Sequence, residues 1–380
     1  MELRTFTWSG ERGWSTPLTG ARPGSLVLAF GGTSLAANPA AVHDLVAAHD
    51  DSIVIGCSSA GEIAGTTLLD DALSVAVAEF DATRVELVSD RVESSVDSYA
   101  VGRRLASALA ALDHGEGLRA IFVLSDGLAV NGGALVAGLV AASGPDVVIT
   151  GGLAGDGDRF EATWVLTGGE LRSGVVTAVG LYGERLRVGH GSRGGWDHFG
   201  PERVVTRAEG NVLFELDGQP ALELYKKYLG DRAAGLPATA LLFPLAVRVP
   251  GRVQRTVTRT ILAVDEATQT MTFAGDIPQG AAAQLMRANF DRLVESAQDA
   301  AESAAVDHQG PLLAVAISCV GRRLLLGEHI EDELEATVAG LPDDAGVVGF
   351  YSYGEISPIA AGTCDLHNQT MTVTTFSEAA

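Results

Sequence analysis

A recurring segment constrains the fold of this 380-residue chain more than any other feature. Each copy has an apolar, strand-like run, then small residues with glycine, then an acidic residue. The copies occupy residues 53–62, 147–156 and 347–355. Each copy follows a helical stretch and an earlier apolar run, at 26–30, 120–124 and 312–317. The pattern predicts a β-α-β unit whose glycine-rich loop ends on Glu62, Asp156 or Glu355.

A longer match relates the second and third copies. Residues 75–88 and 261–273 both have the pattern of β-hairpins that turn at an Asp-Ala-Thr or Asp-x-Ala-Thr corner. A candidate amphipathic helix follows each of them, at 96–112 and 281–305. We therefore expect an α/β fold with mixed sheets flanked by helices, in two pseudo-repeated halves of duplicated hairpin-α-β-α-β units.

The pattern changes between these halves. Strand-like runs at 175–182, 186–190 and 212–216 alternate with glycine-rich turns, and a helix is expected from Pro220 to Gly230. We place the domain boundary near Gly218. The expected parts are an N-terminal segment at 1–22, a first domain at 23–217 and a second domain at 218–380.

Charge and composition exclude several classes of protein. The chain has 26 basic and 48 acidic residues, a net charge of −22, so it should repel nucleic acid and anionic membranes. Three cysteines without a Cys-x-x-Cys pair predict neither a disulfide framework nor a thiolate zinc site. The first residues lack a signal-peptide core, and the apolar stretch 134–142 is too short to span a membrane. These features predict a cytoplasmic protein, and the preference for arginine over lysine is typical of a bacterial one.

Several segments resemble the FIST (F-box and intracellular signal transduction) family, which has FIST N and FIST C portions. The resemblance covers nearly the whole chain, so the two expected domains correspond to FIST N-like and FIST C-like domains. The segments that carry it are Gly-Cys-Ser-Ser-Ala-Gly-Glu-Ile (56–63), Gly-Gly-Leu-Ala-Gly-Asp (151–156), Asp-Gly-Gln-Pro-Ala (217–221), Ser-Cys-Val-Gly-Arg-Arg (318–323), Gly-Phe-Tyr-Ser-Tyr-Gly-Glu-Ile (349–356) and Leu-His-Asn-Gln-Thr (366–370).

The resemblance implies a bacterial or eukaryotic sensory domain that couples a small ligand to signalling. Amino acids are among the ligands proposed for the family, and a downstream signalling protein is an expected partner. Some members resemble haem-based nitric oxide sensors. Enzymatic activity is not part of what the resemblance implies, and no resident cofactor is expected unless the haem alternative holds.

The expected ligand site lies where the loops after the repeated strands converge, because strand ends leave crevices beside exposed backbone amides. Glu62 and Glu355 would attract an ammonium group, while Arg322 or its neighbour Arg323 would pair with a carboxylate. The alternative is that the repeated acids only stabilise their own loops. The candidate ligand-binding residues are Cys57, Ser58, Glu62, Gly151, Gly152, Asp156, Cys319, Arg322, Tyr353 and Glu355.

Two further alternatives remain open from the sequence. His190 or His198 could supply the single axial ligand that a haem needs. Cys319 or Ser58 could act as the nucleophile of an acyl-transfer enzyme or hydrolase, since catalytic triads are assembled in space. The usual nucleotide-binding and nucleophile-elbow motifs are absent from the sequence, which disfavours an enzyme.

Overall fold

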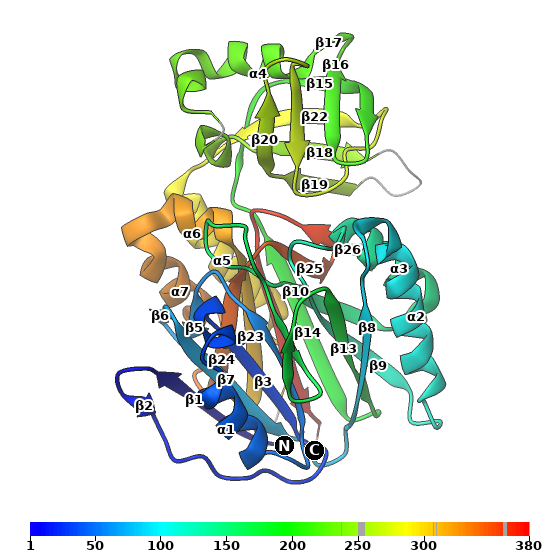
Figure 1. The fold of residues 1–380 in the computed structure, drawn as a ribbon, viewed down its shortest axis with the longest axis vertical. Helices are drawn as coiled ribbons and strands as arrows, with labels where there is room; N and C mark the ends of the chain where they lie inside the picture. The colour runs from blue at the N-terminus through cyan, green and yellow to red at the C-terminus, as the bar shows by residue number, and fades with distance from the viewer. Residues whose placement is uncertain (237, 250–254, 307, 309, 360–362, 380) are drawn as a thin grey trace.

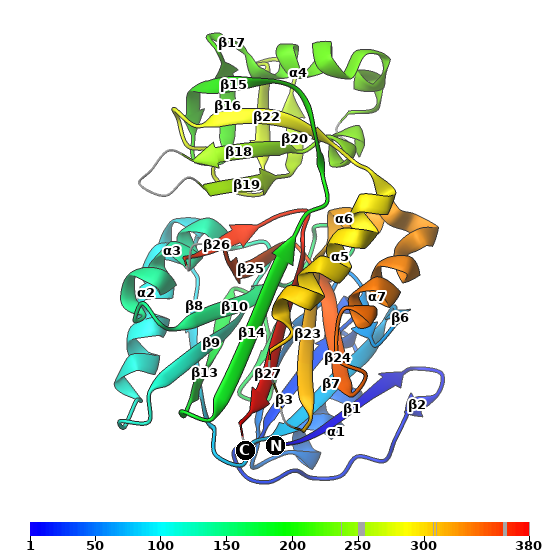
Figure 2. The ribbon, with the colours of Figure 1, turned by 180° about the vertical axis from the view of Figure 1, so that it is seen from behind.

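The computed structural model describes residues 1–236, 238–249, 255–306, 308, 310–359 and 363–379. A core of three mixed sheets lies below a smaller β-rich domain, and both chain termini lie at the end of the core farthest from that domain (Figure 1). From behind, the chain passes from the core into the upper domain after β14 and returns through α5 (Figure 2).

Three units of the core repeat one arrangement of strands. In each, the second strand pairs parallel with the third and antiparallel with the fourth, and the fourth pairs antiparallel with the first. The first unit comprises β1 (Glu2–Ser9), β3 (Leu26–Gly31), α1 (Ala40–Ala48), β4 (Ile53–Ser58) and β7 (Ala72–Glu79). The second comprises β8 (Arg84–Arg91), α2 (Ser98–Ala111), β9 (Leu118–Ser125), α3 (Gly132–Ala142), β10 (Val148–Leu153) and β13 (Val175–Tyr182). The third comprises β14 (Leu186–Arg193), α5 (Phe290–Ala304), β23 (Leu312–Cys319), α6 (Val320–Leu326), α7 (Ile330–Ala339), β24 (Ala345–Ser352) and β27 (Met371–Glu378).

Short hairpins connect the three sheets in a cycle. Each hairpin follows the third strand of its own unit and extends the sheet of another unit. The first adds to β24, the second to β4 and the third to β10. They are β5 (Glu62–Ala64) with β6 (Thr67–Leu69), β11 (Val165–Thr167) with β12 (Glu170–Arg172), and β25 (Gly354–Pro358) with β26 (Cys364–His367). The loop before each hairpin is one of the repeated glycine-rich segments.

The upper domain is inserted between β14 and α5 of the third unit. Its sheet has the order β19-β18-β22-β15-β16-β21-β20, and it has its own cluster of buried apolar residues. Its elements are β15 (Asp197–Glu209), β16 (Val212–Leu216), β17 (Gln219–Pro220), α4 (Ala221–Leu229), β18 (Leu245–Val249), β19 (Arg255–Arg259), β20 (Ile261–Asp265), β21 (Thr270–Phe273) and β22 (Ala282–Arg287). The remaining short elements of the chain are β2 (Gly13–Trp14) and the 3-10 turns Thr33–Ala36, Ser95–Asp97, Gly230–Gly235, Ala238–Leu242 and Gly327–His329.

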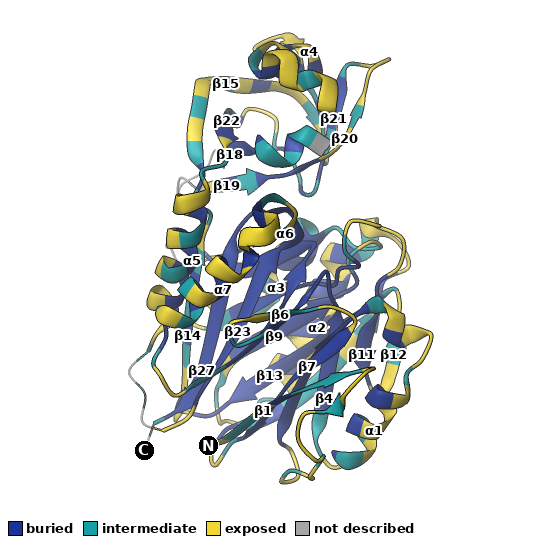
Figure 3. Ribbon diagram, turned by 90° about the vertical axis from the view of Figure 1, so that its left-hand side faces the viewer, coloured by how far each residue is buried: buried dark blue, intermediate teal, exposed yellow. Residues whose placement is uncertain are grey.

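The three core sheets share one apolar interior. Strands of all three sheets contribute to it, and Phe30 stacks on Phe350 with ring centroids 4.8 Å apart. The helices cover the outer faces, so their solvent sides are exposed while the sheets are buried (Figure 3). Within the described residues, no helix is both long and apolar enough to cross a membrane.

The structure confirms an α/β fold with mixed sheets and flanking helices, but it does not show two duplicated halves. Residues 75–88 do not form a hairpin: β7 lies in the first sheet and β8 in the second. Residues 261–273 do form one, since β20 pairs with β21. Apolar periodicity marks strands but does not tell which strands pair, so the two segments looked equivalent.

One other expectation differs from the structure. The helix expected at 281–305 is split into β22 and α5, because the Asn289 side chain accepts a hydrogen bond from the Arg292 amide and starts the helix at Phe290. The boundary near Gly218 falls between β16 and β17, which pair within the upper sheet. The N-terminal segment 1–22 contributes β1 to the first sheet.

Candidate functional site

The three repeated loops meet at one end of the core. Each loop is hydrogen-bonded to another through its backbone, so the three form one connected layer beyond the carboxyl ends of the parallel strands. The bonds run from Ala60 N to Tyr351 O (2.8 Å), Tyr351 N to Gly61 O (2.8 Å), Gly155 N to Ser58 O (3.0 Å) and Tyr353 N to Leu153 O (3.2 Å). The crevice predicted from the repeat should therefore lie in this layer.

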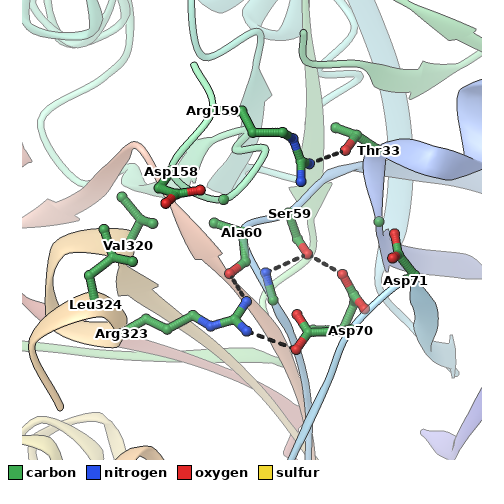
Figure 4. A pocket seen from close by; sticks show the side chains of 14 residues that line it. Thr33, Ser59, Ala60, Asp70, Asp71, Asp158, Arg159, Val320, Arg323 and Leu324 are labelled. Atoms are coloured by element: carbon green, nitrogen blue, oxygen red, sulfur yellow. Dashed lines mark hydrogen bonds and ion pairs between the residues drawn. The ribbon is translucent and has the colours of Figure 1, made fainter. Parts of the chain in front are cut away.

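A cleft of about 300 Å³ opens beside these loops (Figure 4). All three units contribute to its lining: the first supplies Gly32, Thr33, Ser59–Glu62, Asp70 and Asp71, the second supplies Gly157–Arg159, and the third supplies Val320, Arg323 and Leu324. This volume lies at the lower end of the range for ligand pockets, so it suits a molecule the size of an amino acid.

Two arginines bring positive charge to the cleft. The Arg323 guanidinium donates to the Ala60 carbonyl and, at 2.8 Å, to the exposed Asp70 carboxylate. Arg159 donates from Nη2 to the Thr33 hydroxyl at 2.6 Å. In the part of the chain that the structure describes, no carboxylate lies within ion-pairing distance of Arg159. Arg159 is therefore the cation of the cleft that is free to pair with a bound carboxylate.

Glu62 lies at the buried end of the cleft. Its carboxyl group accepts hydrogen bonds from the Ser59 hydroxyl and, at 3.0 Å, from the Ala72 amide. Burial raises the pKa of Glu62 to about 8, although both hydrogen bonds act in the opposite direction. Glu62 is thus mainly protonated at neutral pH, and the negative charge of the cleft comes from Asp70, Asp71 and Asp158 at its rim.

Glu355 occupies the corresponding position in the third unit but does not line this cleft. It accepts from the Ser352 hydroxyl at 2.8 Å, as Glu62 does from Ser59, and from the amide and hydroxyl of Thr370 at 3.2 and 2.8 Å. Burial raises the pKa of Glu355 to about 8 as well. Its contacts tie the loop after β24 to the residue before β27, which favours a structural role.

Asp156, the acid of the second loop, shapes the segment that carries Arg159. Its carboxylate accepts hydrogen bonds from three consecutive backbone amides at 2.8–2.9 Å and from the Tyr353 hydroxyl. The three amides belong to residues 160, 161 and 162. Asp156 is buried and fully engaged, so it positions Arg159 instead of contacting a ligand itself.

Arg322 is placed where it cannot meet a ligand. The side chain is completely buried and pairs with buried Glu333 at 2.6 Å. It also donates to the carbonyl oxygens of Gly194 (2.7 Å) and Leu293 (2.8 Å). The carboxylate-binding role expected for Arg322 therefore has no geometric support, and Arg323, the alternative from the sequence, lines the cleft instead.

The other candidates belong to the interior. Burial raises the pKa of the Cys57 and Cys319 thiols, so neither is poised as a nucleophile. The buried Ser58 hydroxyl accepts from the Trp164 amide at 3.1 Å, and no histidine of the described residues bonds to Ser58 or Cys319. A Cβ on Gly151 would overlap the Val123 carbonyl, and one on Gly152 would lie 3.0 Å from Ile317, so both glycines are needed for packing.

The two histidines of the haem alternative lie in different parts of the molecule. His190 is in β14 of the core and lines a cleft of about 610 Å³, whereas His198 is exposed on β15 of the upper domain. Apart from His190 itself, the described lining of this cleft includes no aromatic side chain and combines valine, isoleucine and proline with small or polar residues. This lining does not fit the large apolar walls that a haem needs.

Sequence reasoning missed most of the cleft's charged residues. Arg159 lies three positions beyond the Asp156 that ends the second repeat, and Asp70 with Asp71 lies just before β7. The only signal was proximity to the repeated loops. Nothing in the sequence shows that the segments after β3, before β7 and within α6 meet at the same cleft.

Two protein-family models match this chain. The model of the FIST N domain matches residues 25–219, and that of the FIST C domain matches residues 221–358. The chain belongs to the FIST family. FIST domains are proposed to be sensory signalling modules for small ligands.

Curated relatives resemble this FIST protein over part of its length. The Mycobacterium tuberculosis H37Rv protein named "Uncharacterized protein Rv0628c" is 27% identical over 246 residues, which cover 61% of each chain. The Methanocaldococcus jannaschii protein named "Uncharacterized protein MJ1623" is 28% identical over 258 residues, which cover 58% of this chain and 47% of that protein. The match thus spans about three fifths of the mycobacterial relative and under half of the archaeal one.

Proposed function

We propose that this FIST protein senses a small zwitterionic metabolite, such as an amino acid, in the cleft between the three loops. The proposal rests mainly on the position of Arg159. Among the described residues this cation has no carboxylate partner, and the rim of its cleft also has three aspartates. A ligand carboxylate would pair with Arg159, while its ammonium group would face Asp70, Asp71 or Asp158. The protein would act in the cytoplasm on a downstream signalling partner.

Further support comes from how the cleft is assembled. Its lining joins residues of three units that are far apart in the sequence, and Arg323 already links the first and third units. A ligand that bridges Arg159 of the second unit to the aspartates of the first would add another link. Binding would therefore change how firmly the units hold together, which is a physical basis for a signal.

The test is a thermal-shift screen of amino acids and related metabolites, followed by calorimetric titration of any stabiliser. We expect a zwitterionic stabiliser, and we expect Arg159→Ala to weaken its binding by about tenfold to a hundredfold, the effect of losing one charge-assisted hydrogen bond. Arg119→Ala is the matched control, because Arg119 is exposed at the amino end of β9, away from the carboxyl-end cleft.

Two outcomes would contradict the proposal. One is that only ligands without a carboxylate bind, and the other is that Arg159→Ala binds the stabiliser as tightly as the unaltered protein. Turnover of the ligand that is lost in Cys319→Ala or Ser58→Ala would instead support an enzyme, which the buried positions of both residues disfavour.

A further inference from the structure

A second cleft lies between the core and the upper domain, on the other side of the loop that carries Arg159. It has a volume of about 320 Å³, and residues of both domains line it. Phe160 and Tyr353 come from the core, and Leu262 and Asp276 come from the upper domain. We propose that this cleft is a separate binding site for a small arylalkylamine, a single aromatic ring with a short chain that ends in an ammonium group, independent of the metabolite site proposed above.

The apolar character of the cleft comes from side chains that are exposed to solvent in this structure. Eight large apolar residues are exposed in the described part of the chain, and three of them line this one cleft. They are Leu128 (41% exposed), Phe160 (46%) and Leu262 (44%). Single exposed apolar residues are ordinary, but three from both walls of one concave site favour an apolar ligand between them.

Phe160 is held as a platform for a ring. Its ring stacks on Tyr353 with centroids 4.4 Å apart and planes 11° from parallel, while its other surroundings leave it half exposed. Its backbone has φ of 54°, a left-handed conformation that is unfavourable for a bulky residue. Hydrogen bonds from its amide to Asp156 and Tyr353 maintain that conformation. Strained residues held in this way occur preferentially at ligand sites.

A carboxylate gives the cleft its polarity. One oxygen of Asp276 accepts from the Asn131 side chain at 3.1 Å, a contact that also joins the two domains. Within the described residues, the other carboxylate oxygen has no hydrogen-bond donor, and the nearby Arg259 donates at 3.1 Å to the Asp276 backbone carbonyl and not to its carboxylate. An aromatic ring against Phe160 with an ammonium group at Asp276 would satisfy both features. The volume limits the ligand to about one ring with a short chain.

The test uses 2-phenylethylamine as the probe. Two related compounds serve as comparisons: n-butylamine has the ammonium group but no ring, and phenylacetate has the ring but a carboxylate in place of the ammonium group. We expect calorimetric titration to show saturable binding of 2-phenylethylamine, with at least tenfold weaker binding of both counterparts. Leu262→Ala and Asp276→Asn should each weaken the binding of 2-phenylethylamine by at least threefold. Both changes lie in the upper domain and leave the Arg159 cleft untouched, so amino acid binding there should persist.

Val204→Ala is the matched control, since Val204 is equally exposed on the upper domain but lies outside the cleft. Arg159→Ala serves as the second control and should bind the probe normally. The inference is overturned if 2-phenylethylamine shows no saturable binding, if phenylacetate binds as tightly, or if neither cleft variant differs from Val204→Ala. Loss of probe binding in Arg159→Ala alone would show that the probe occupies the first cleft, which also overturns it.

Discussion

Arg322 and Arg323 are adjacent in the sequence but have opposite surroundings. α6 turns the first toward buried Glu333 and the second toward the cleft and Asp70. A helix separates neighbouring residues by about 100°, so consecutive side chains face different environments. The sequence pointed to this pair as carboxylate-binding residues, but only the packing of α6 shows which arginine lines the cleft.

Removing Arg322 should affect folding and not ligand recognition. Arg322→Ala leaves the Glu333 carboxylate buried without its partner, so we expect a loss of about 3–5 kcal/mol in the free energy of unfolding. Urea unfolding measures this. Arg172→Ala, which breaks the exposed Arg172–Glu170 pair, is the control and should cost less than about 1 kcal/mol. If both variants lose a similar small amount of the free energy of unfolding, the buried Arg322–Glu333 pair contributes little to stability.

Glu62 should make stability depend on pH. Its pKa is about 8 in the folded protein and 4.5 as its ordinary value, so the folded state holds its proton more tightly. The stabilising effect of that proton is complete below about pH 4.5 and is lost as the pH rises through about 8. Between these values, Glu62→Gln should remove a slope of up to about 1.4 kcal/mol per pH unit.

The measurement is urea unfolding of both proteins at intervals between about pH 5 and 8. Glu223→Gln, a change at an exposed position of α4, should leave the slope unaltered. If the free energy of unfolding changes with pH in the same way in the unaltered protein and in Glu62→Gln, then Glu62 ionises normally in the fold.

At the scale of elements, α2 and α3 pack closely through reciprocal glycines. A Cβ on Gly102 would overlap the Leu135 carbonyl, and one on Gly138 would overlap the Tyr99 carbonyl. We expect Gly102→Ala or Gly138→Ala to cost about 1–3 kcal/mol by forcing the helices apart. Gly133→Ala is the control within α3, because its nearest neighbour would lie 3.5 Å away and alanine favours helix. Thermal unfolding measures this. A lower unfolding temperature for Gly133→Ala than for Gly102→Ala and Gly138→Ala would contradict this account.

The repeated loops are also a feature of this scale. Their sequence pattern predicted β-α-β units, and the structure places each loop after the third strand of a unit. The pattern did not reveal that the hairpin after each loop crosses to another sheet. Strand propensity is local, whereas the choice of partner strand depends on which edge is free in the assembled core.

For the whole molecule, the upper domain is an insertion that the core should tolerate losing. Asp197 and Arg287 are paired neighbours on β15 and β22, so the chain leaves and re-enters the core at nearly one point. Replacing residues 198–286 with an Asn-Gly turn should leave a core that unfolds cooperatively, because both parts have apolar cores of their own. Circular dichroism with thermal unfolding tests this. A non-cooperative or aggregated product would show that the two parts fold as one.

The sequence alone determined what depends on local order: the α/β class, many of the strands and helices, and the three repeated loops. It also carried the motifs of the FIST family. Only the tertiary structure decided which strands share a sheet, that the core has three units with an inserted domain, and that Arg159, Arg323 and Asp70 share a cleft. The reason is physical. Periodicity and turn chemistry act between neighbours in the chain, whereas pairing, burial and the meeting of charges depend on contacts between residues far apart in sequence.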